Sequence, residues 1–483
     1  MALVVYNTLS RSKEKFVPLH DKKVNMFVCG LTVYDDAHMG HAKVFVNFDV
    51  IARWLRNIGY SVKYIQNITD VDDKIINRAK ERCMAPIELA RHYEARFLED
   101  LQAIGAKESV DMFPRSHDYI DTIQEQIQLL ANKNYAYYLD GDVYYDVAKF
   151  KRYTKLSGMS IDMLQKHRIE PKEGKRHEYD FALWKTAKPG EPSWKIKVKF
   201  KEGEKVLEGR PGWHIEDTAM TYAIFGPKYD LHGGASELIF PHHTNEIAQA
   251  EAAFDQTQFV KYWLHAGVLN MKGQKMSKSL KNFITIREVL SKYSTEEIRY
   301  MLCSTHYRKD IDYTDELMER SRKSLRYMYS ALSLFYNMKE ADSAKSDLVA
   351  LKIAKSFTKG FAAAMNDDFD TPLALSGLIA TINALRSFAD THEGMSAKAK
   401  HEIMDMVVGM PRVIGLLTQD SYKKAIPGKA YALIKERDVL RASKEFDKAD
   451  AIRSELESKY GVMLEDTEHG TIWYAAGVVP TEV

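Results

Sequence analysis

A short apolar segment followed by a histidine tetrad constrains the fold of this chain more than any other feature. Val24 to Cys29 (VNMFVC) is apolar and rich in β-branched residues, which is typical of a buried parallel strand. Helical spacing runs from Gly40 to Ile58, and Val62 to Ile68 is a second strand. Strand, helix and strand over this length predict the βαβ unit of a nucleotide-binding sheet.

The tetrad His38-Met39-Gly40-His41 lies where the first strand gives way to the helix. Histidines at positions i and i+3 share one face of a helix. A helix N-terminus attracts phosphate through its free N–H groups and its dipole. Gly40 allows a nucleotide to pass close to the backbone. The tetrad therefore predicts a site for the phosphates of a nucleotide.

A second motif, Lys275-Met276-Ser277-Lys278-Ser279, lies far along the chain. Each lysine presents a compact positive charge that suits a phosphate oxygen. Taken alone, the histidine tetrad could equally be a surface histidine pair, and the lysine motif could equally be a solvated loop. Both motifs in this order favour activation of a carboxylate by ATP with loss of pyrophosphate. A dehydrogenase is excluded because no Gly-x-Gly-x-x-Gly follows the first strand.

Composition restricts the class of protein. The 483 residues give room for two to four domains, and the net charge of +2 means that a polyanion must meet local basic patches. Three cysteines argue against a disulfide framework and for a reducing compartment. No apolar run approaches the length of a membrane span, and the N-terminus lacks the basic start of a signal peptide. We therefore predict a cytoplasmic globular protein.

The parallel sheet resumes at Tyr229 to His232, which precedes a helix from Pro241 to Ala253 and a strand near Phe259 to Gly267. We therefore predict an α/β fold with a split, Rossmann-like parallel-sheet catalytic domain. Its two halves, 1–90 and 210–284, flank an α/β connective insertion at 91–209. Within this insertion, the Lys- and Glu-rich stretch from Lys166 to Glu208 is expected to be polar and partly mobile.

Helical periodicity dominates the chain after Thr285. We predict a region over 285–315 that follows the lysine motif, a helical bundle over 316–424 and a small C-terminal domain over 425–483. A single charged helix from Lys429 to Lys459 is expected in this last domain, before a small β element.

These segments resemble the class I aminoacyl-tRNA synthetases and, among them, the cysteinyl-tRNA synthetases. The resemblance runs nearly end to end and is carried by an ordered set of motifs. They are Cys29 to Asp35, the histidine tetrad, Asn67 to Ile75, Gly209 to Glu216, His232-Gly233-Gly234, Phe240 to His243 with Asn245 and Glu246, Lys275 to Ser279, and Leu464 to Thr467 with Gly470, Thr471 and Trp473. The resemblance implies ATP with Mg²⁺, L-cysteine and tRNA(Cys) as partners. We expect a monomer that makes no membrane contact.

The resemblance also implies one zinc ion per chain in the amino-acid pocket, where the thiolate of the substrate becomes a ligand. The positions that match the protein ligands are Cys29, Asp217, His242 and Glu246. His242 and Glu246, at i and i+4 on one helix, can reach one metal. Family members usually carry a second cysteine at the position of Asp217. Because a carboxylate is a harder ligand, we expect zinc to be held less tightly here. The alternative is that the metal is absent and Asp217 only caps a helix.

For ATP, the resemblance implies that His38 and His41 stabilise charge at the α-phosphate. Lys275 and Lys278 would hold the departing pyrophosphate. The glycines implied in the approach of ribose and adenine are Gly40, Gly233 and Gly234. The positions that match the surroundings of bound cysteine are Thr69 and Trp213, and the competing interpretation of Trp213 is a core-filling residue.

The resemblance assigns anticodon recognition to the C-terminal domain and contact with the tRNA stem to residues 285–315. The matching positions for anticodon recognition are Arg437, Asp466 and Trp473, and Trp473 could stack on an unpaired base. Two other functions stay open. A related ligase could join cysteine to a small amine such as an amino sugar, but it would not need the C-terminal domain. A non-catalytic RNA-binding paralogue would not need the intact histidine and lysine motifs.

Overall fold

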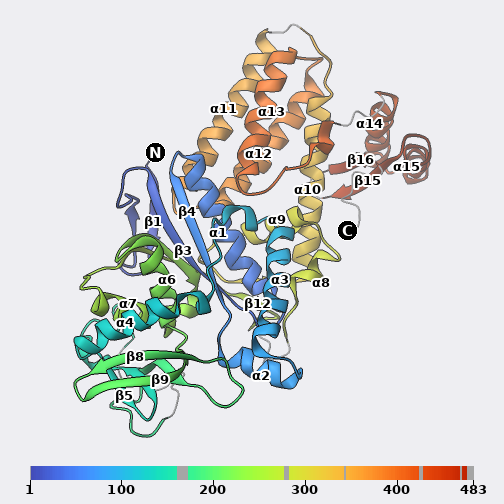
Figure 1. Cartoon of the computed structure of the whole chain (residues 1–483). Coiled ribbons are helices and arrows are strands. Elements are labelled where there is room, and N and C mark those ends of the chain that lie inside the picture. Colours follow the sequence, from blue (N-terminus) through green and yellow to red (C-terminus); the bar gives the residue numbers. More distant parts are fainter. Residues whose placement is uncertain are drawn as a thin grey trace.

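A parallel sheet forms the centre of the molecule (Figure 1). The computed structural model describes residues 2–159, 172–276, 282–341, 344–423, 428–467 and 470–475. The strands of the sheet are β3 (Lys23–Thr32), β4 (Ser61–Thr69), β10 (Tyr229–Ala235) and β11 (Val260–Ala266). They lie in the order β11-β10-β3-β4, and every pairing is parallel. Two segments far apart in the sequence thus share one sheet, which confirms the predicted split α/β fold.

The two faces of this sheet are covered by different helices. The helix α1 (Met39–Asn57) connects β3 to β4, and α7 (His242–Ala253) connects β10 to β11. Successive side chains of a strand point to opposite faces. Met26 and Val28 therefore join the core that includes α1, whereas Phe27 and Cys29 join the core that includes α6 (Ile215–Phe225) and α7. This alternation directs Cys29 toward α6 and α7.

Between β4 and α6, the chain forms helices and a separate antiparallel sheet, which make up the insertion and the segment that leads into it. The helices are α2 (Asp73–Glu81), α3 (Pro86–Ala103) and α4 (Ile120–Asn132). The sheet has the order β5-β6-β7-β9-β8, formed by β5 (Ala136–Leu139), β6 (Asp142–Tyr145), β7 (Phe181–Thr186), β8 (Trp194–Phe200) and β9 (Gly203–Pro211).

The stretch from Lys166 to Glu208, expected to be polar and partly mobile, forms β7, β8 and most of β9, so regular strands occupy much of it. Residues 160–171 lie outside the described residues. In β8 the buried side chains of Ile196, Val198 and Phe200 alternate with lysines. This period of two is typical of a strand with one face buried, so the lysines mark its outer face.

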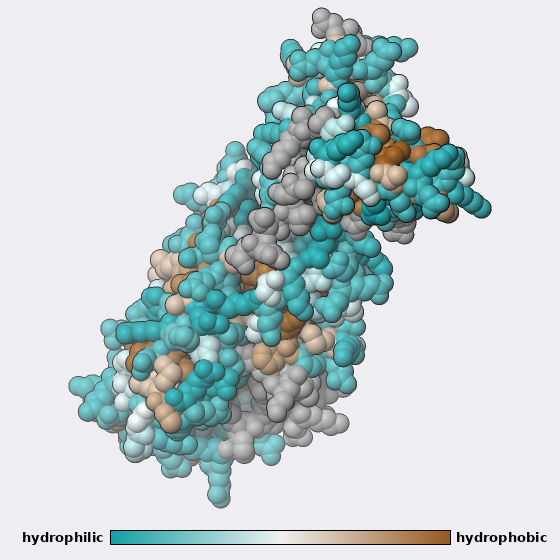
Figure 2. Space-filling model, turned by 90° about the vertical axis from the view of Figure 1, so that its right-hand side faces the viewer, coloured by the Kyte–Doolittle hydropathy of each residue, from teal (hydrophilic) through white to brown (hydrophobic). Residues whose placement is uncertain are grey.

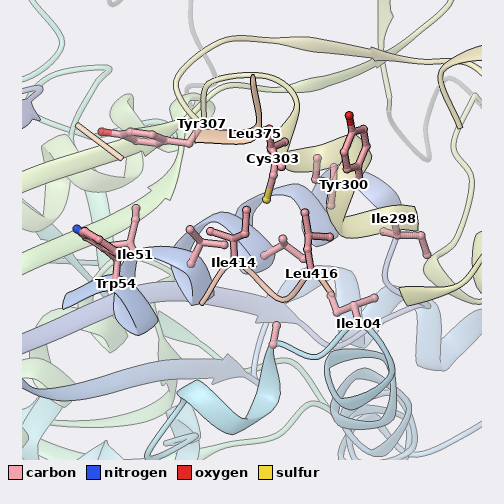
Figure 3. Close-up of a cluster of buried hydrophobic side chains, with 14 of the residues drawn as sticks. Ile51, Trp54, Ile104, Ile298, Tyr300, Cys303, Tyr307, Leu375, Ile414 and Leu416 are labelled. Atoms are coloured by element: carbon pink, nitrogen blue, oxygen red, sulfur yellow. The ribbon is translucent and has the colours of Figure 1, made fainter. Parts of the chain in front are cut away.

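Two small sheets and two short helices accompany the central parallel sheet. One sheet pairs β1 (Val4–Asn7) with β2 (Ser12–Lys15). The other has the order β13-β12-β14, formed by β12 (Leu269–Met271), β13 (Gln274–Lys275) and β14 (Ile311–Tyr313). The helices α8 (Ile286–Leu290) and α9 (Thr295–Cys303) lie between β13 and β14 in sequence. In Figure 3, Ile51 and Trp54 of α1 lie beside Cys303, Ile414 and Leu416 in a shared apolar cluster.

A helical bundle extends from this cluster at the top of Figure 1. Its helices are α10 (Asp315–Tyr336), α11 (Ala344–Asn366), α12 (Thr371–Thr391) and α13 (Ala397–Arg412). Among the described helices, only α12 is long and apolar enough to cross a membrane. Its side chains Leu378, Ile382 and Leu385 are buried in the apolar core, as expected for a bundle helix. On the face seen in Figure 2, hydrophilic residues dominate and apolar residues form only small patches.

The chain continues into a small C-terminal module with α14 (Gly428–Ala442), α15 (Phe446–Tyr460), β15 (Val462–Thr467) and β16 (Gly470–Ala475). The prediction of one helix from Lys429 to Lys459 is wrong, because the chain turns between α14 and α15 at Lys444, whose φ is 64°. Two helices can bury Ile434 and Leu456 in one core, which a single continuous helix could not do.

Candidate active site

The four predicted metal ligands converge at the carboxyl end of β3. Cys29 lies near the end of that strand, Asp217 lies in the first turn of α6, and His242 begins α7. The Sγ of Cys29 lies 3.3 Å from Oδ2 of Asp217. The Nε2 of His242 lies 3.0 Å from that same oxygen and 3.0 Å from Oε1 of Glu246. All four side chains are buried, so β3, α6 and α7 together enclose them.

Outer partners hold two of these side chains in place. Asn67, on β4, donates from Nδ2 to Oδ1 of Asp217 at 2.7 Å. The Nδ1 of His242 lies 2.9 Å from Nδ1 of His214. Partners of this kind fix the ring and carboxylate orientations of metal ligands. The remaining oxygen of Asp217 and the Nε2 of His242 therefore face the centre of the cluster.

Two further imidazoles, to which the sequence analysis gave no role, meet Cys29 from the other side. The Nε2 atoms of His232 and His243 lie 3.4 and 3.1 Å from its Sγ. Tyr229 OH lies 2.6 Å from Nδ1 of His232, and Nε2 of His265 lies 2.7 Å from Nδ1 of His243. The signal in the sequence was the His242-His243 pair, because adjacent residues at the start of α7 both turn toward the sheet.

The donors form two overlapping sets that share Cys29 and Glu246. One set adds Asp217 and His242, and the other adds His232 and His243, and in each the donor atoms lie within 4.8 Å of one another. Zinc binds sulfur, imidazole nitrogen and carboxylate oxygen. The residues present therefore fit a zinc ion.

The electrostatics of the cluster also favour a cation. Burial, with repulsion from Asp217, raises the pKa of the Glu246 carboxyl well above its ordinary value. Burial, with repulsion from Asp217 and Glu246, raises the pKa of the Cys29 thiol. Neither carboxylate oxygen of Glu246 accepts a hydrogen bond from the residues that the structure describes. A bound cation would stabilise both anions, since a coordinating thiol is deprotonated by the metal.

The histidine tetrad lies at the N-terminus of α1, on the other face of the sheet from α6 and α7. The rings of His38 and His41 stack, with centroids 3.7 Å apart and an angle of 16° between their planes. The backbone N–H of His38 donates to Nδ1 of His41 at 3.2 Å. A Cβ at Gly40 would lie 2.9 Å from the ring of His38. Only glycine therefore leaves room for this stack.

The other predicted nucleotide residues are positioned as follows. Lys275 ends β13, and Lys278 lies outside the described residues. A Cβ at Gly233 would lie 2.2 Å from the ring of Phe48 on α1, and a Cβ at Gly234 would lie 2.9 Å from His243. Close packing between helices and sheet thus accounts for both glycines, and their contact with a nucleotide stays a prediction.

The two predicted cysteine-binding residues flank the metal cluster. Thr69 is buried at the end of β4, where its Oγ1 accepts a hydrogen bond from Asn67 at 3.4 Å. Trp213 stacks on His242, with ring centroids 4.4 Å apart. It is half-buried and also lines a cavity of about 370 Å³ formed by the start of α2, by β7 and by the segments that precede α6 and α7. Trp213 therefore connects the cluster to an open cavity.

The three predicted anticodon residues lie inside the C-terminal module. Arg437 is fully buried, and its Nη1 and Nη2 donate to Asp466 at 2.6 and 2.7 Å. Trp473 is 4% exposed and packs against the core formed with Ile434 and Leu456. This arrangement favours a role in holding the module together, and direct contact with the anticodon stays a prediction.

Comparison with known proteins identifies the family of this chain. Residues 15–323 match the family described as tRNA synthetases class I (C) catalytic domain, and residues 360–418 match the DALR domain. The chain is 43% identical to Cysteine--tRNA ligase of Thermococcus onnurineus, over 98% of this chain and 99% of that protein. It is 44% identical to Cysteine--tRNA ligase of Stutzerimonas stutzeri, over 99% of this chain and all of that protein.

A solved structure is similar in fold. It is Mycobacterium tuberculosis methionyl-tRNA synthetase in complex with methionyl-adenylate, with a TM-score of 0.60 and 16% identity, over 85% of this chain and 94% of that chain. The parallel sheet, the matched catalytic domain and the near-complete coverage of the curated relatives lead to one assignment. The chain belongs to the cysteine–tRNA ligase family of class I tRNA synthetases.

Proposed function

We propose that this protein activates L-cysteine with ATP and transfers it to the 3′-terminal adenosine of tRNA(Cys). The carboxylate of cysteine attacks the α-phosphorus of ATP, which forms cysteinyl-adenylate and releases pyrophosphate. A hydroxyl of the terminal adenosine then attacks the adenylate and releases AMP. The observation that carries this proposal is the buried donor cluster around Cys29, at the sheet edge where α/β proteins bind ligands. The names of its relatives support it.

The proposed metal is one zinc ion per chain, held by Cys29, Asp217, His242 and Glu246. When bound, zinc would take the thiolate of the substrate as a further ligand. Cysteine and serine differ by one atom, and packing alone discriminates by roughly 10–200-fold per small group. A soft metal binds thiolate better than alcohol and so provides the additional selectivity. Trp213 and Thr69 would border the substrate at this position.

The proposed nucleotide site lies at the N-terminus of α1. His38 and His41 would stabilise negative charge at the α-phosphate, and Lys275 and Lys278 would hold the pyrophosphate, with Mg²⁺ accompanying the nucleotide. Gly40, Gly233 and Gly234 would border the ribose and adenine. Such phosphoryl chemistry depends on positioning and electrostatic stabilisation more than on a general base. The hydrogen bond from His38 to His41 orients this pair before the substrate arrives.

The regions beyond the sheet complete the proposal. Residues 1–90 and 210–284 form the catalytic domain, 91–209 the connective insertion, 285–315 the stem-contact region and 316–424 the bundle. The C-terminal domain, 425–483, would recognise the anticodon. We expect a cytoplasmic monomer, and sedimentation of the purified protein with and without tRNA tests its oligomeric state.

The experiment that tests the function has two steps with the purified full-length chain. The first is cysteine-dependent exchange of pyrophosphate into ATP. The second is transfer of labelled cysteine to tRNA(Cys) or, in parallel, to an amino sugar. Exchange with transfer to tRNA alone is the expected result. Transfer to the amino sugar alone would establish the related ligase, and the absence of exchange would indicate a non-catalytic paralogue.

A further inference from the structure

Lys43 is a buried lysine on α1, two residues beyond His41. Its side chain is 0% exposed, although lysines are almost never fully buried without a partner. Its Nζ donates to the backbone carbonyl of Val268 at 3.3 Å and to that of Lys309. Burial lowers the pKa of Lys43 to about 8, and the nearby charge of Asp310 only partly offsets this effect. An apolar side chain of the same length would avoid the desolvation of an amine.

The two carbonyl groups lie at the base of the small sheet that carries the lysine motif. Val268 directly precedes β12, which pairs with β13, and β13 ends at Lys275. Lys309 lies shortly before β14, which pairs with the other edge of β12. By holding both carbonyls, Lys43 fixes the strand pair β12 and β13, which ends at Lys275, relative to helix α1.

The chain that returns from the lysine motif is attached to the same part of α1. The backbone N–H of Met39 donates to the carbonyl of Ile284 at 3.0 Å, and the N–H of Ile286 donates to the carbonyl of Ala37 at 3.0 Å. Both flanks of the motif are thus bonded to residues 37–43, which carry the histidine pair. On the return side the bonds are between backbone groups, whereas on the outgoing side Lys43 provides them.

We propose that Lys43 is a positioning residue for adenylate formation, which keeps the strand that ends at Lys275 in register with the helix that carries His38 and His41. This inference depends on the proposed function. It makes a specific distinction between the two steps of the reaction. Lys43 is needed while pyrophosphate is held and released, and it is not needed once the adenylate has formed.

The test compares Lys43→Met with Lys400→Met in the full-length protein. Lys400 is a matched control because it is also buried, and its Nζ donates to the backbone carbonyl of Met338 at 2.7 Å in the helical bundle. A misplacement of about 1 Å can lower a rate by ~100-fold. We expect Lys43→Met to lower kcat for pyrophosphate exchange by about 10- to 100-fold. The KM for cysteine should stay within about twofold, since the cluster at Cys29 lies on the other face of the sheet.

A second measurement separates positioning from general damage. Transfer of cysteine from preformed, enzyme-bound adenylate to tRNA should proceed at the wild-type rate in Lys43→Met. If Lys43→Met does not fold, Lys43→Gln, which keeps an N–H donor on a shorter side chain, replaces it. An unchanged exchange rate, or equal losses in exchange, transfer and affinity for cysteine, would overturn the inference. Absence of exchange in the wild-type protein would instead refute the proposed function.

Discussion

The cluster around Cys29 and the core around Arg437 are both buried polar groups that the family resemblance singled out. They differ in how their charges are satisfied. In the C-terminal module, Arg437 pairs through two nitrogens with Asp466, and this hydrogen bonding lowers the pKa of the Asp466 carboxyl. In the catalytic cluster, burial raises the pKa of Glu246 instead. A buried carboxylate that is held by a cationic side chain stabilises a fold, whereas a cluster with a carboxylate that accepts no hydrogen bond from the described residues, such as Glu246, favours a bound cation.

The largest expected effect comes from removing the soft ligand shared by both donor sets. We expect Cys29→Ser to lower cysteine-dependent exchange by about 10³-fold and to release zinc, because an alcohol is a poor zinc ligand. Exchange kinetics and elemental analysis measure the two effects. Cys83→Ser is the control, since Cys83 is exposed. If Cys29→Ser retained zinc and activity, the cluster around Cys29 would not depend on its thiol, and the contrast with the C-terminal module would be lost.

The C-terminal module should respond in the opposite way. Arg437→Met leaves Asp466 without its main partner and should destabilise the module by about 2–3 kcal/mol, at the low end for a buried pair because Asp466 is partly exposed. Aminoacylation should fall while pyrophosphate exchange stays within about twofold. Urea unfolding and both assays provide the comparison, with Lys435→Met as an exposed control on the same helix. Loss of exchange in Arg437→Met would show that the module also supports the catalytic site.

Replacing the harder ligand by a thiolate should strengthen the cluster. We expect Asp217→Cys to retain zinc against a chelator about 10- to 100-fold longer, since zinc prefers thiolate to carboxylate at such sites. The rate of zinc release to a chromogenic chelator measures this. Asp230→Cys serves as a control for the added thiol, because Asp230 is buried on β10 and its carboxylate binds the backbone of Leu19 and Asn25. Unchanged zinc release would mean that Asp217 is not a ligand.

The smallest expected effect is a pH dependence of stability that arises from Glu251 on α7. Burial raises the pKa of Glu251 to about 7, despite its ion pair with Arg152. The folded-state pKa is above the unfolded value of 4.5, so this contribution to stability is present below pH 4.5 and is lost as pH rises through 7. Glu251→Gln should flatten that part of the curve by about 2–4 °C in Tm. Glu402→Gln, on the exposed side of α13, should leave the curve unchanged.

Asp466 provides the contrasting case for pH. Its pKa lies below the ordinary 3.8, so the stability that it contributes is present above that value and is lost as pH falls further. Acidification below pH 4 should therefore weaken the module. The contribution of Glu251 to stability no longer changes in that range. Thermal unfolding followed by tryptophan fluorescence, with Trp473→Phe as the reference for the module, distinguishes the two regions.

Sequence periodicity predicted the central sheet because β3, β4 and α1 have regular apolar patterns. It failed for β8, where alternating lysines concealed a buried face, and for α14 and α15, where charge continued across a turn. The meeting of Cys29 and Glu246 in one buried cluster could be expected from the family motifs. The His242-His243 pair was a signal for an imidazole near the sheet, but the approach of His232 and His243 to Cys29 could not be predicted, since it depends on how α7 packs on β10. The burial of Trp473 likewise follows from tertiary packing that no local pattern records.

The measurement that tests the central claim most directly is the zinc content of the purified, untagged, full-length protein after extensive dialysis. About one zinc per chain, lost in Cys29→Ser and kept in Arg437→Met, is the predicted result. It would show that the anionic cluster around Cys29 holds a metal, whereas the Arg437–Asp466 pair holds the fold of the C-terminal module. An enzyme that selects cysteine over serine at full activity with no bound zinc would contradict this account.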